Sequence, residues 1–157
     1  MNTTLSDKIS YEGEFSEGTI NTLLKKIDAW PSSHFKNKAD VKYAVIELCS
    51  NIISHHSSTD FGSIIIDPQH SFCYLEVSSF ASAKDYEIVT SILNELKSVK
   101  DLKEHYFSKL ERAGHAESVQ LGMLKTYRCC NGNIELIGKT VASKILLTFK
   151  LKIDDCN

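Results

Sequence analysis

The sequence contains no apolar run approaching the ~18 residues that span a bilayer. Its first ten residues are polar and lack the apolar core of a signal peptide. We therefore expect a cytoplasmic protein with no membrane association. Proline is scarce, with 2 residues, and no repeat, low-complexity stretch or Gly/Pro-rich linker divides the chain. These absences predict a single domain over residues 1–157.

An excess of basic residues is also missing, because 18 Lys and Arg stand against 20 Asp and Glu, for a net charge of −2. Proteins that bind nucleic acid usually carry a basic patch, so we expect no nucleic-acid partner. Hydrophobic residues make up 42% of the chain and charged residues 24%, which favours a packed core over disorder.

The 5 cysteines include no C-x-x-C pair of the kind that a zinc site needs. Cys129 and Cys130 are adjacent, which is unfavourable for a simple disulfide. We expect all five to be reduced thiols, most of them buried. The only histidine pair is His55–His56, whose side chains would point about 100° apart on a helix and would not chelate one metal.

The most informative segment is a predicted helix at roughly 38–56. Its buried face is predicted to consist of Val41, Val45, Leu48 and Ile52, which recur at helical spacing. A second set recurs every four residues and stacks on an adjacent stripe: Glu47, Asn51 and His55. Taken alone, such a stripe is usually a solvated face. In a cleft, however, the carboxylate can accept a proton and the carboxamide oxygen can hold Mg²⁺.

The remaining pattern predicts a strand, a helix, the 38–56 helix, a hairpin, further helices and a final hairpin. In the first half of the chain we expect a strand at 9–16, a helix from Ser16 to before Pro31, and a hairpin over 61–78. A helix capped by Ser82 or Asp85 should follow and continue to Leu96, before a charged segment at 97–115. The last predicted elements are a helix around 119–127 and strands at 134–138 and 145–151, joined by a turn at 139–143. Helices segregated from such strands predict an α/β fold: a two-layer sandwich whose mixed, mostly antiparallel sheet is covered on one face by helices.

The order Glu47-x-x-x-Asn51-x-x-x-His55 resembles the N box of the GHKL ATPase superfamily, the fold of histidine kinases and gyrase. The closest form is that of the anti-sigma-factor serine kinases, and the wider layout resembles the SiaB-type switch kinases, which phosphorylate a small STAS-domain partner. The resemblance implies that Glu47 assists the attacking hydroxyl and that Asn51 binds Mg²⁺ on the ATP phosphates, with His55 completing the box. It further implies ATP and Mg²⁺ as cofactors and a STAS-type antagonist protein as partner.

The family's two other nucleotide-binding boxes are incomplete in this chain. The box Asp-x-Gly-x-Gly, whose Asp accepts a hydrogen bond from the adenine amino group, corresponds to 78–82, where neither Asp nor Gly occurs. Ser79 is its nearest replacement; otherwise these serines form a loop and a helix cap. The glycine-rich box that cradles phosphates corresponds to 114–123, where Gly114, Leu121 and Gly122 fit. We therefore expect weaker ATP binding than at a complete site, because a neutral acceptor is weaker than a carboxylate.

Basic residues precede the glycine-rich box and could reach phosphates, although such a run is more often a solvated helix face. They are Lys97, Lys100, Lys103, Lys109 and Arg112.

Three functions compete. The intact Glu47 and Asn51 favour a protein serine/threonine kinase of a partner-switching system, whereas the altered 78–82 segment favours a degenerate GHKL-fold regulator that binds a partner without kinase activity. The third is an unrelated α/β domain with a coincidental N box. Self-association into a homodimer is compatible with all three.

Overall fold

The protein is described by a computed structural model that places residues 7–33, 35–55, 61–101, 104–105 and 118–155. The elements, in chain order, are β1 (Ile9–Glu14), α1 (Glu17–Asp28), α2 (Lys38–His55), β2 (Phe61–Pro68), β3 (Phe72–Ala81), α3 (Ala83–Ser98), α5 (Ser118–Cys129), β4 (Ile134–Val141) and β5 (Lys144–Asp154). Much of the segment expected at 97–115 lies outside the described residues.

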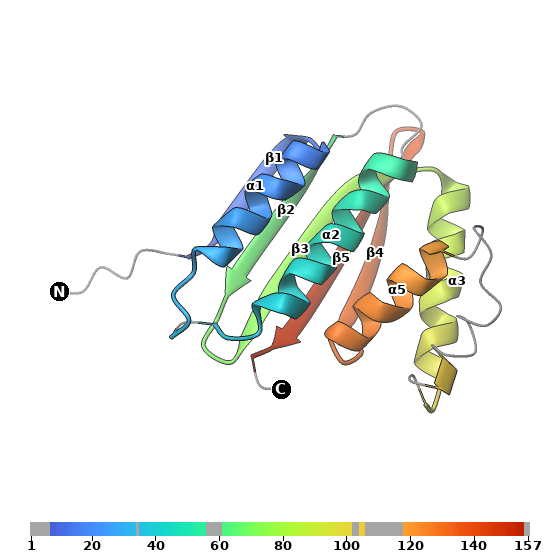
Figure 1. Ribbon diagram of the computed structural model, residues 1–157. Coiled ribbons are helices and arrows are strands. Elements are labelled where there is room, and N and C mark those ends of the chain that lie inside the picture. The colour runs from blue at the N-terminus through green and yellow to red at the C-terminus, as the bar shows by residue number, and fades with distance from the viewer. Residues whose placement is uncertain (1–6, 34, 56–60, 102–103, 106–117, 156–157) are drawn as a thin grey trace.

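The strands form one sheet in the order β1-β2-β3-β5-β4, and each of the four neighbouring pairs is antiparallel. Figure 1 shows the helices in a layer on one face of this sheet, with α5 between α2 and α3. The predicted two-layer α/β sandwich is confirmed. None of the helices in the described ranges has the length and apolar character needed to span a bilayer.

Local sequence explains where the helices begin. Ser16 caps α1 by accepting a hydrogen bond from the backbone N–H of Thr19, and Ser82 caps α3 through the N–H of Asp85. The start of α2 is held by a contact distant in sequence. The carboxylate of Asp155 accepts hydrogen bonds from the backbone N–H groups of Lys36, at 2.6 Å, and Asn37, at 3.0 Å.

Several predicted strand ends are wrong: β1 ends at Glu14 and not at residue 16, and β5 continues past Leu151 to Asp154. Two more lie beside predicted turns. The strand expected to end at Ser78 continues to Ala81, because its last residues pair with β5, as in Ser79 opposite Leu147. The turn expected over 139–143 is confined to residues 142–143, since Val141 still pairs with Lys144 and Ala142 takes a left-handed φ of 55°. At both turns the strands continue further than the local turn residues predicted, because hydrogen bonds to the neighbouring strand extend them.

The core lies between the sheet and the helix layer. Three predicted core residues of α2, Val45, Leu48 and Ile52, are 0%, 2% and 2% exposed, so the predicted apolar face is confirmed. They pack with the inward side chains of the central strands, which alternate as Ile64, Ile66, Leu75 and Val77.

Four of the five cysteines lie in the described part, and all four are free thiols, as predicted. Burial raises the pKa of Cys49 to about 12 and that of Cys130 to about 11. These thiols are therefore protonated at neutral pH and unreactive as nucleophiles. Cys156 lies outside the described residues.

Candidate functional site

Glu47 stands on the side of α2 that faces α5, and its side chain is half-buried. The Tyr43 hydroxyl, one turn earlier on α2, donates a hydrogen bond to Glu47 Oε1 at 3.1 Å. A residue pair four apart on a helix lies on one stripe, so the hydrogen bond needs no distortion of the backbone. The carboxylate is therefore held in one orientation at the boundary between the two helices.

Gly122 of α5 packs directly against this carboxylate. A Cβ atom at position 122 would overlap Glu47 Oε2 and would lie 3.0 Å from Glu47 Cδ. Glycine is thus the residue type that lets α5 approach Glu47 without displacing it. The structure brings together two predicted site residues, Glu47 of α2 and Gly122 of α5.

Lys125 adds a positive charge to this group from the next turn of α5. Its Nζ lies 4.2 Å from the centre of the Tyr43 ring, a cation–π contact that joins α5 to α2. We did not predict Tyr43 or Lys125 as site residues. Their spacings were a usable signal, because Tyr43 precedes Glu47 by four positions and Lys125 follows Gly122 by three.

Asn51, one turn beyond Glu47, is half-buried on the same helix. Its carboxamide oxygen is a suitable Mg²⁺ ligand. His55 is the last residue of α2, and its side chain lies outside the described part. Within the described residues no cluster of three or more His, Cys, Asp or Glu is arranged to hold a metal ion.

Ser79 lies within β3 and not in the loop that we expected as one alternative. It is 6% exposed and alternates with buried Val77, so it faces the helix layer. Its cross-strand neighbour on β2 is Gly62, where an added Cβ would lie 3.3 Å from Ile52 Cδ1 on α2. Ser79 therefore sits on the same side of the sheet as the helix that carries Glu47 and Asn51.

The remaining predicted site residues lie mostly outside the described part of the chain. Gly114 lies outside the described residues, as do Lys103, Lys109 and Arg112, and Leu121 belongs to α5 but its side chain is not described. Lys97 and Lys100 are exposed at and beyond the end of α3.

A shallow, open cavity of about 320 Å³ lies along α3. It is lined by Tyr86, Glu87, Thr90, Ser91 and Asn94. All five belong to one helix and none is a predicted site residue, so we do not assign this cavity to nucleotide.

The described part of the chain is a two-layer α/β sandwich in which Tyr43, Glu47 and Gly122 meet at the boundary between α2 and α5. A chain in the crystal structure of the SiaB–SiaC complex from Pseudomonas aeruginosa has the same fold, with a TM-score of 0.72, and the match covers 92% of this chain and 89% of that chain. The identity is 16%, so the likeness establishes the fold, and the predicted SiaB-like architecture is confirmed at that level. No protein-family model and no curated protein matches the chain.

Proposed function

We propose that this protein is an ATP- and Mg²⁺-dependent serine/threonine kinase that phosphorylates a small partner protein. One observation carries the proposal: the Glu47 carboxylate is held between the Tyr43 hydroxyl and Gly122 of α5. Tyr43 donates a hydrogen bond to Oε1, and Oε2 lies against Gly122, which has no polar side chain that would compete for that oxygen. A carboxylate oriented in this way suits a base that meets an incoming hydroxyl.

The reaction is the displacement of ADP by a partner hydroxyl. The hydroxyl oxygen forms a bond to the γ-phosphorus, the bond from that phosphorus to the ADP bridging oxygen breaks, and the hydroxyl proton passes to Glu47. In phosphoryl transfer the protein contributes mainly positioning and charge neutralisation. Asn51 would hold Mg²⁺, which when bound neutralises charge on the phosphate oxygens. Ser79 would accept the hydrogen bond from the adenine amino group.

A second candidate is a regulator of the same fold that binds a partner and transfers nothing. The observation that favours it is that Ser79, which the resemblance sets at the place of the family's adenine-binding Asp, is a small neutral side chain buried within β3. Losing one charge-assisted hydrogen bond weakens binding by about tenfold or more. A pocket of this kind could have lost nucleotide while keeping a docking surface.

A protein partner is supported by the structure that shares this fold, since it is described as a complex of two proteins. We propose a STAS-type antagonist for this chain, on the resemblance of the N box, and a cytoplasmic setting for the exchange.

The deciding experiment incubates the purified protein with a candidate STAS partner, Mg²⁺ and labelled ATP. Label on the partner supports the kinase. Glu47→Gln should lower transfer by something like 10²–10⁴-fold and leave nucleotide binding intact, because the amide keeps the shape and removes the base. Asn51→Ala should abolish Mg²⁺-dependent nucleotide binding measured by calorimetry.

Matched controls lie on α3, where Glu87→Gln and Asn94→Ala make the same chemical changes on exposed residues. Both controls should behave like the unmutated protein. Partner binding without any transfer of label would contradict the kinase and leave the regulator.

A further inference from the structure

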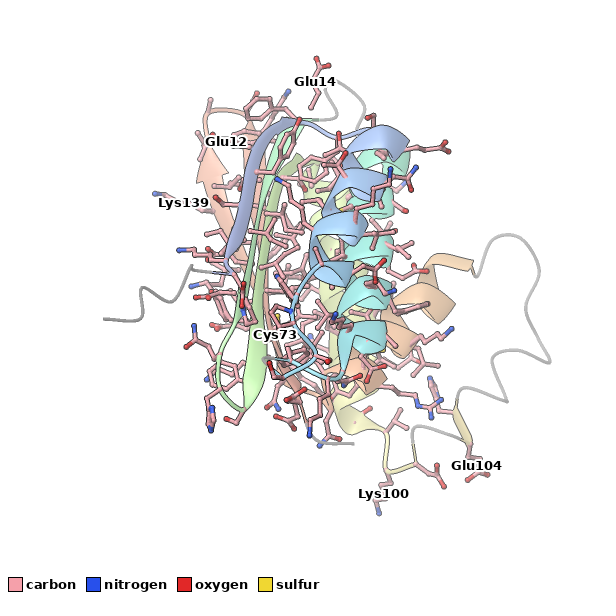
Figure 2. The ribbon with its side chains drawn as sticks, turned by 60° about the vertical axis from the view of Figure 1, so that its left-hand side comes forward. Glu12, Glu14, Cys73, Lys100, Glu104 and Lys139 are labelled. Carbon is pink, nitrogen blue, oxygen red and sulfur yellow. The ribbon has the colours of Figure 1, made fainter. Side chains whose placement is uncertain are left out.

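The helix layer has an outer surface that points away from the sheet. Figure 2 shows Cys73 between the sheet and the helices, and it shows Glu12 and Lys139 beyond the sheet, on the opposite side of the molecule. α2 buries one face against the sheet, so its opposite face, which carries Tyr43 and Ile46, points out of the helix layer. A partner that reaches the proposed base must therefore approach over these helices.

Contacts between α2 and α5 recur about one turn apart, and they run in opposite directions along the two helices (Figure 1). The α2 residues along this boundary are three or four positions apart, and they contact α5 residues that have the same spacing in reverse order. These pairs are Asp40 with Cys129, Tyr43 with Lys125, and Glu47 with Gly122. α5 therefore places Lys125 one turn from Glu47, on the side nearer the start of α2.

The charge of Lys125 is held in place and is not neutralised by the described residues. Its side chain is exposed, and Nζ lies 4.2 Å from the centre of the Tyr43 ring. The ring attracts the cation through its face, but it supplies no carboxylate for the three N–H donors of the ammonium. No carboxylate in the described part of the chain forms an ion pair with Lys125. The ammonium can therefore bind an anionic group of a second molecule.

The order of groups along α2 indicates which molecule supplies that anion. Tyr43, Glu47 and Asn51 follow one another at four-residue intervals, about 6 Å apart along the helix axis. In the proposed reaction Asn51 holds Mg²⁺ on the nucleotide phosphates and Glu47 meets the incoming hydroxyl. The attacking and leaving oxygens lie roughly in line with the phosphorus between them. The nucleotide therefore extends from Glu47 towards Asn51, and the acceptor segment of the partner enters from the side of Tyr43 and Lys125.

We propose that Lys125 binds an acidic side chain of the partner protein, close in sequence to the hydroxyl residue that receives the phosphate. The inference rests on the proposed function and adds the chemistry by which the partner is recognised. A distance of about 6 Å corresponds to about two residues of an extended segment, or to three or four residues on a helix. Ile46, three residues beyond Tyr43 and 38% exposed, adds an apolar contact on the same outer surface.

The experiment measures the Kd of the full chain for the candidate STAS partner by calorimetry, a readout that requires no transfer. Lys125→Glu should raise the partner Kd by about tenfold or more, because it places two like charges together, and should leave the ATP Kd unchanged. Lys125→Arg should keep the partner Kd within a few-fold. Lys26→Glu makes the same charge change on an exposed side chain of α1 and should alter neither Kd. Circular dichroism confirms that each variant folds.

Partner variants identify the acidic residue. Each variant changes one Asp or Glu of the partner to Lys, and one of them should restore the affinity that Lys125→Glu loses, as a double-mutant cycle measures. Mass spectrometry of the phosphorylated partner then locates the acceptor hydroxyl. The restoring position should lie within about four residues of that hydroxyl, and a restoring position far from it in sequence would overturn the proposal.

Two variants of Tyr43 test how the ammonium is held. Tyr43→Phe keeps the ring under Lys125 and should leave the partner Kd unchanged. Tyr43→Leu removes the ring and should raise the partner Kd several-fold. Equal partner affinities for the two variants would contradict the contribution of the ring.

The failure of this proposal and the failure of the kinase can be told apart. An unchanged partner Kd in a folded Lys125→Glu variant would overturn the proposal and leave the kinase standing. A weaker ATP Kd with an unchanged partner Kd would overturn it in favour of a contact with the nucleotide phosphates. Absence of label on a partner that binds would contradict the kinase, whereas the effect of Lys125→Glu on the partner Kd would still support or overturn the contact at Lys125. A STAS partner that does not bind would contradict both.

Discussion

The hydroxyl of Tyr43 donates a hydrogen bond to Oε1 of Glu47, while the ring of the same tyrosine carries the Lys125 ammonium on its face at 4.2 Å. One side chain therefore links the base proposed for phosphoryl transfer to the helix that would contact the phosphates. Because Tyr43 uses its hydroxyl for one contact and its ring for the other, the two can be separated by substitution.

Tyr43→Phe removes the hydrogen bond and keeps the ring under Lys125. We expect transfer to fall by roughly tenfold with little change in nucleotide Kd, because one hydrogen bond to a charged group contributes about 1.5–3 kcal/mol. Single-turnover assays measure the transfer rate, and calorimetry measures the nucleotide Kd. Tyr11→Phe is the control, since it loses a hydroxyl bond to the Glu14 carbonyl on β1, and it should leave transfer unchanged. Equal rates for the two variants would contradict the role of Tyr43.

Gly122→Ala should displace the Glu47 carboxylate, because the new Cβ would overlap Oε2, at the far end of a side chain that can turn away. The displacement breaks the hydrogen bond from Tyr43, so we expect it to offset the gain of about 1 kcal/mol that alanine normally brings to a helix. Gly18→Ala in α1 is the matched control, because the nearest atom to its Cβ would be Ser16 Oγ at 3.6 Å. Thermal unfolding should raise Tm for Gly18→Ala and not for Gly122→Ala, and an equal gain for both would contradict the contact between Gly122 and Glu47.

Ser79→Asp should tighten adenine-nucleotide binding by about tenfold or more if Ser79 occupies the position of the family's Asp. Calorimetry measures the change, with circular dichroism to confirm folding. Ser78→Asp provides a control one residue away, since Ser78 points to the opposite face and bonds Thr148 at 2.8 Å. Unchanged affinity in a folded Ser79→Asp variant would remove Ser79 from the site.

Leu48→Ala should lower the free energy of unfolding by about 2–5 kcal/mol, because it leaves a cavity between α2 and the sheet. Leu48 is 2% exposed. Ile46→Ala, two residues earlier and 38% exposed, should cost about 1 kcal/mol or less. Urea unfolding measures the free energy of unfolding of both variants. Similar midpoints would be inconsistent with the buried face of α2.

The Cys49 thiol should make stability depend on alkaline pH. Its pKa is raised by burial from 9.0 to about 12 in the folded protein. Its contribution is therefore fully present below pH 9 and is lost as pH rises towards 12, by up to about 1.4 kcal/mol per pH unit. Cys49→Ala should remove that dependence, so its stability deficit should shrink between pH 8 and pH 10 in urea unfolding with reductant. The deficit of Val45→Ala, which carries no titrating group, should stay constant.

The sequence predicted those parts of the protein whose signal is local. Helical spacing identified the buried face of α2, and Ser16 and Ser82 marked helix starts as capping residues. The stripe of Glu47 and Asn51 followed from the same spacing. Each depends on residues within one or two turns of each other, so neighbouring sequence is sufficient to specify it.

Only the tertiary structure decided which residues of other helices and strands these parts contact. The contact of Glu47 with Gly122 and the position of Lys125 over Tyr43 depend on how α5 packs against α2. The continuation of β3 through Ser79 depends on pairing with β5. These features join residues that are distant in the sequence, and no local preference specifies them, because their energy comes from packing and cross-strand hydrogen bonds that exist only once the chain has folded.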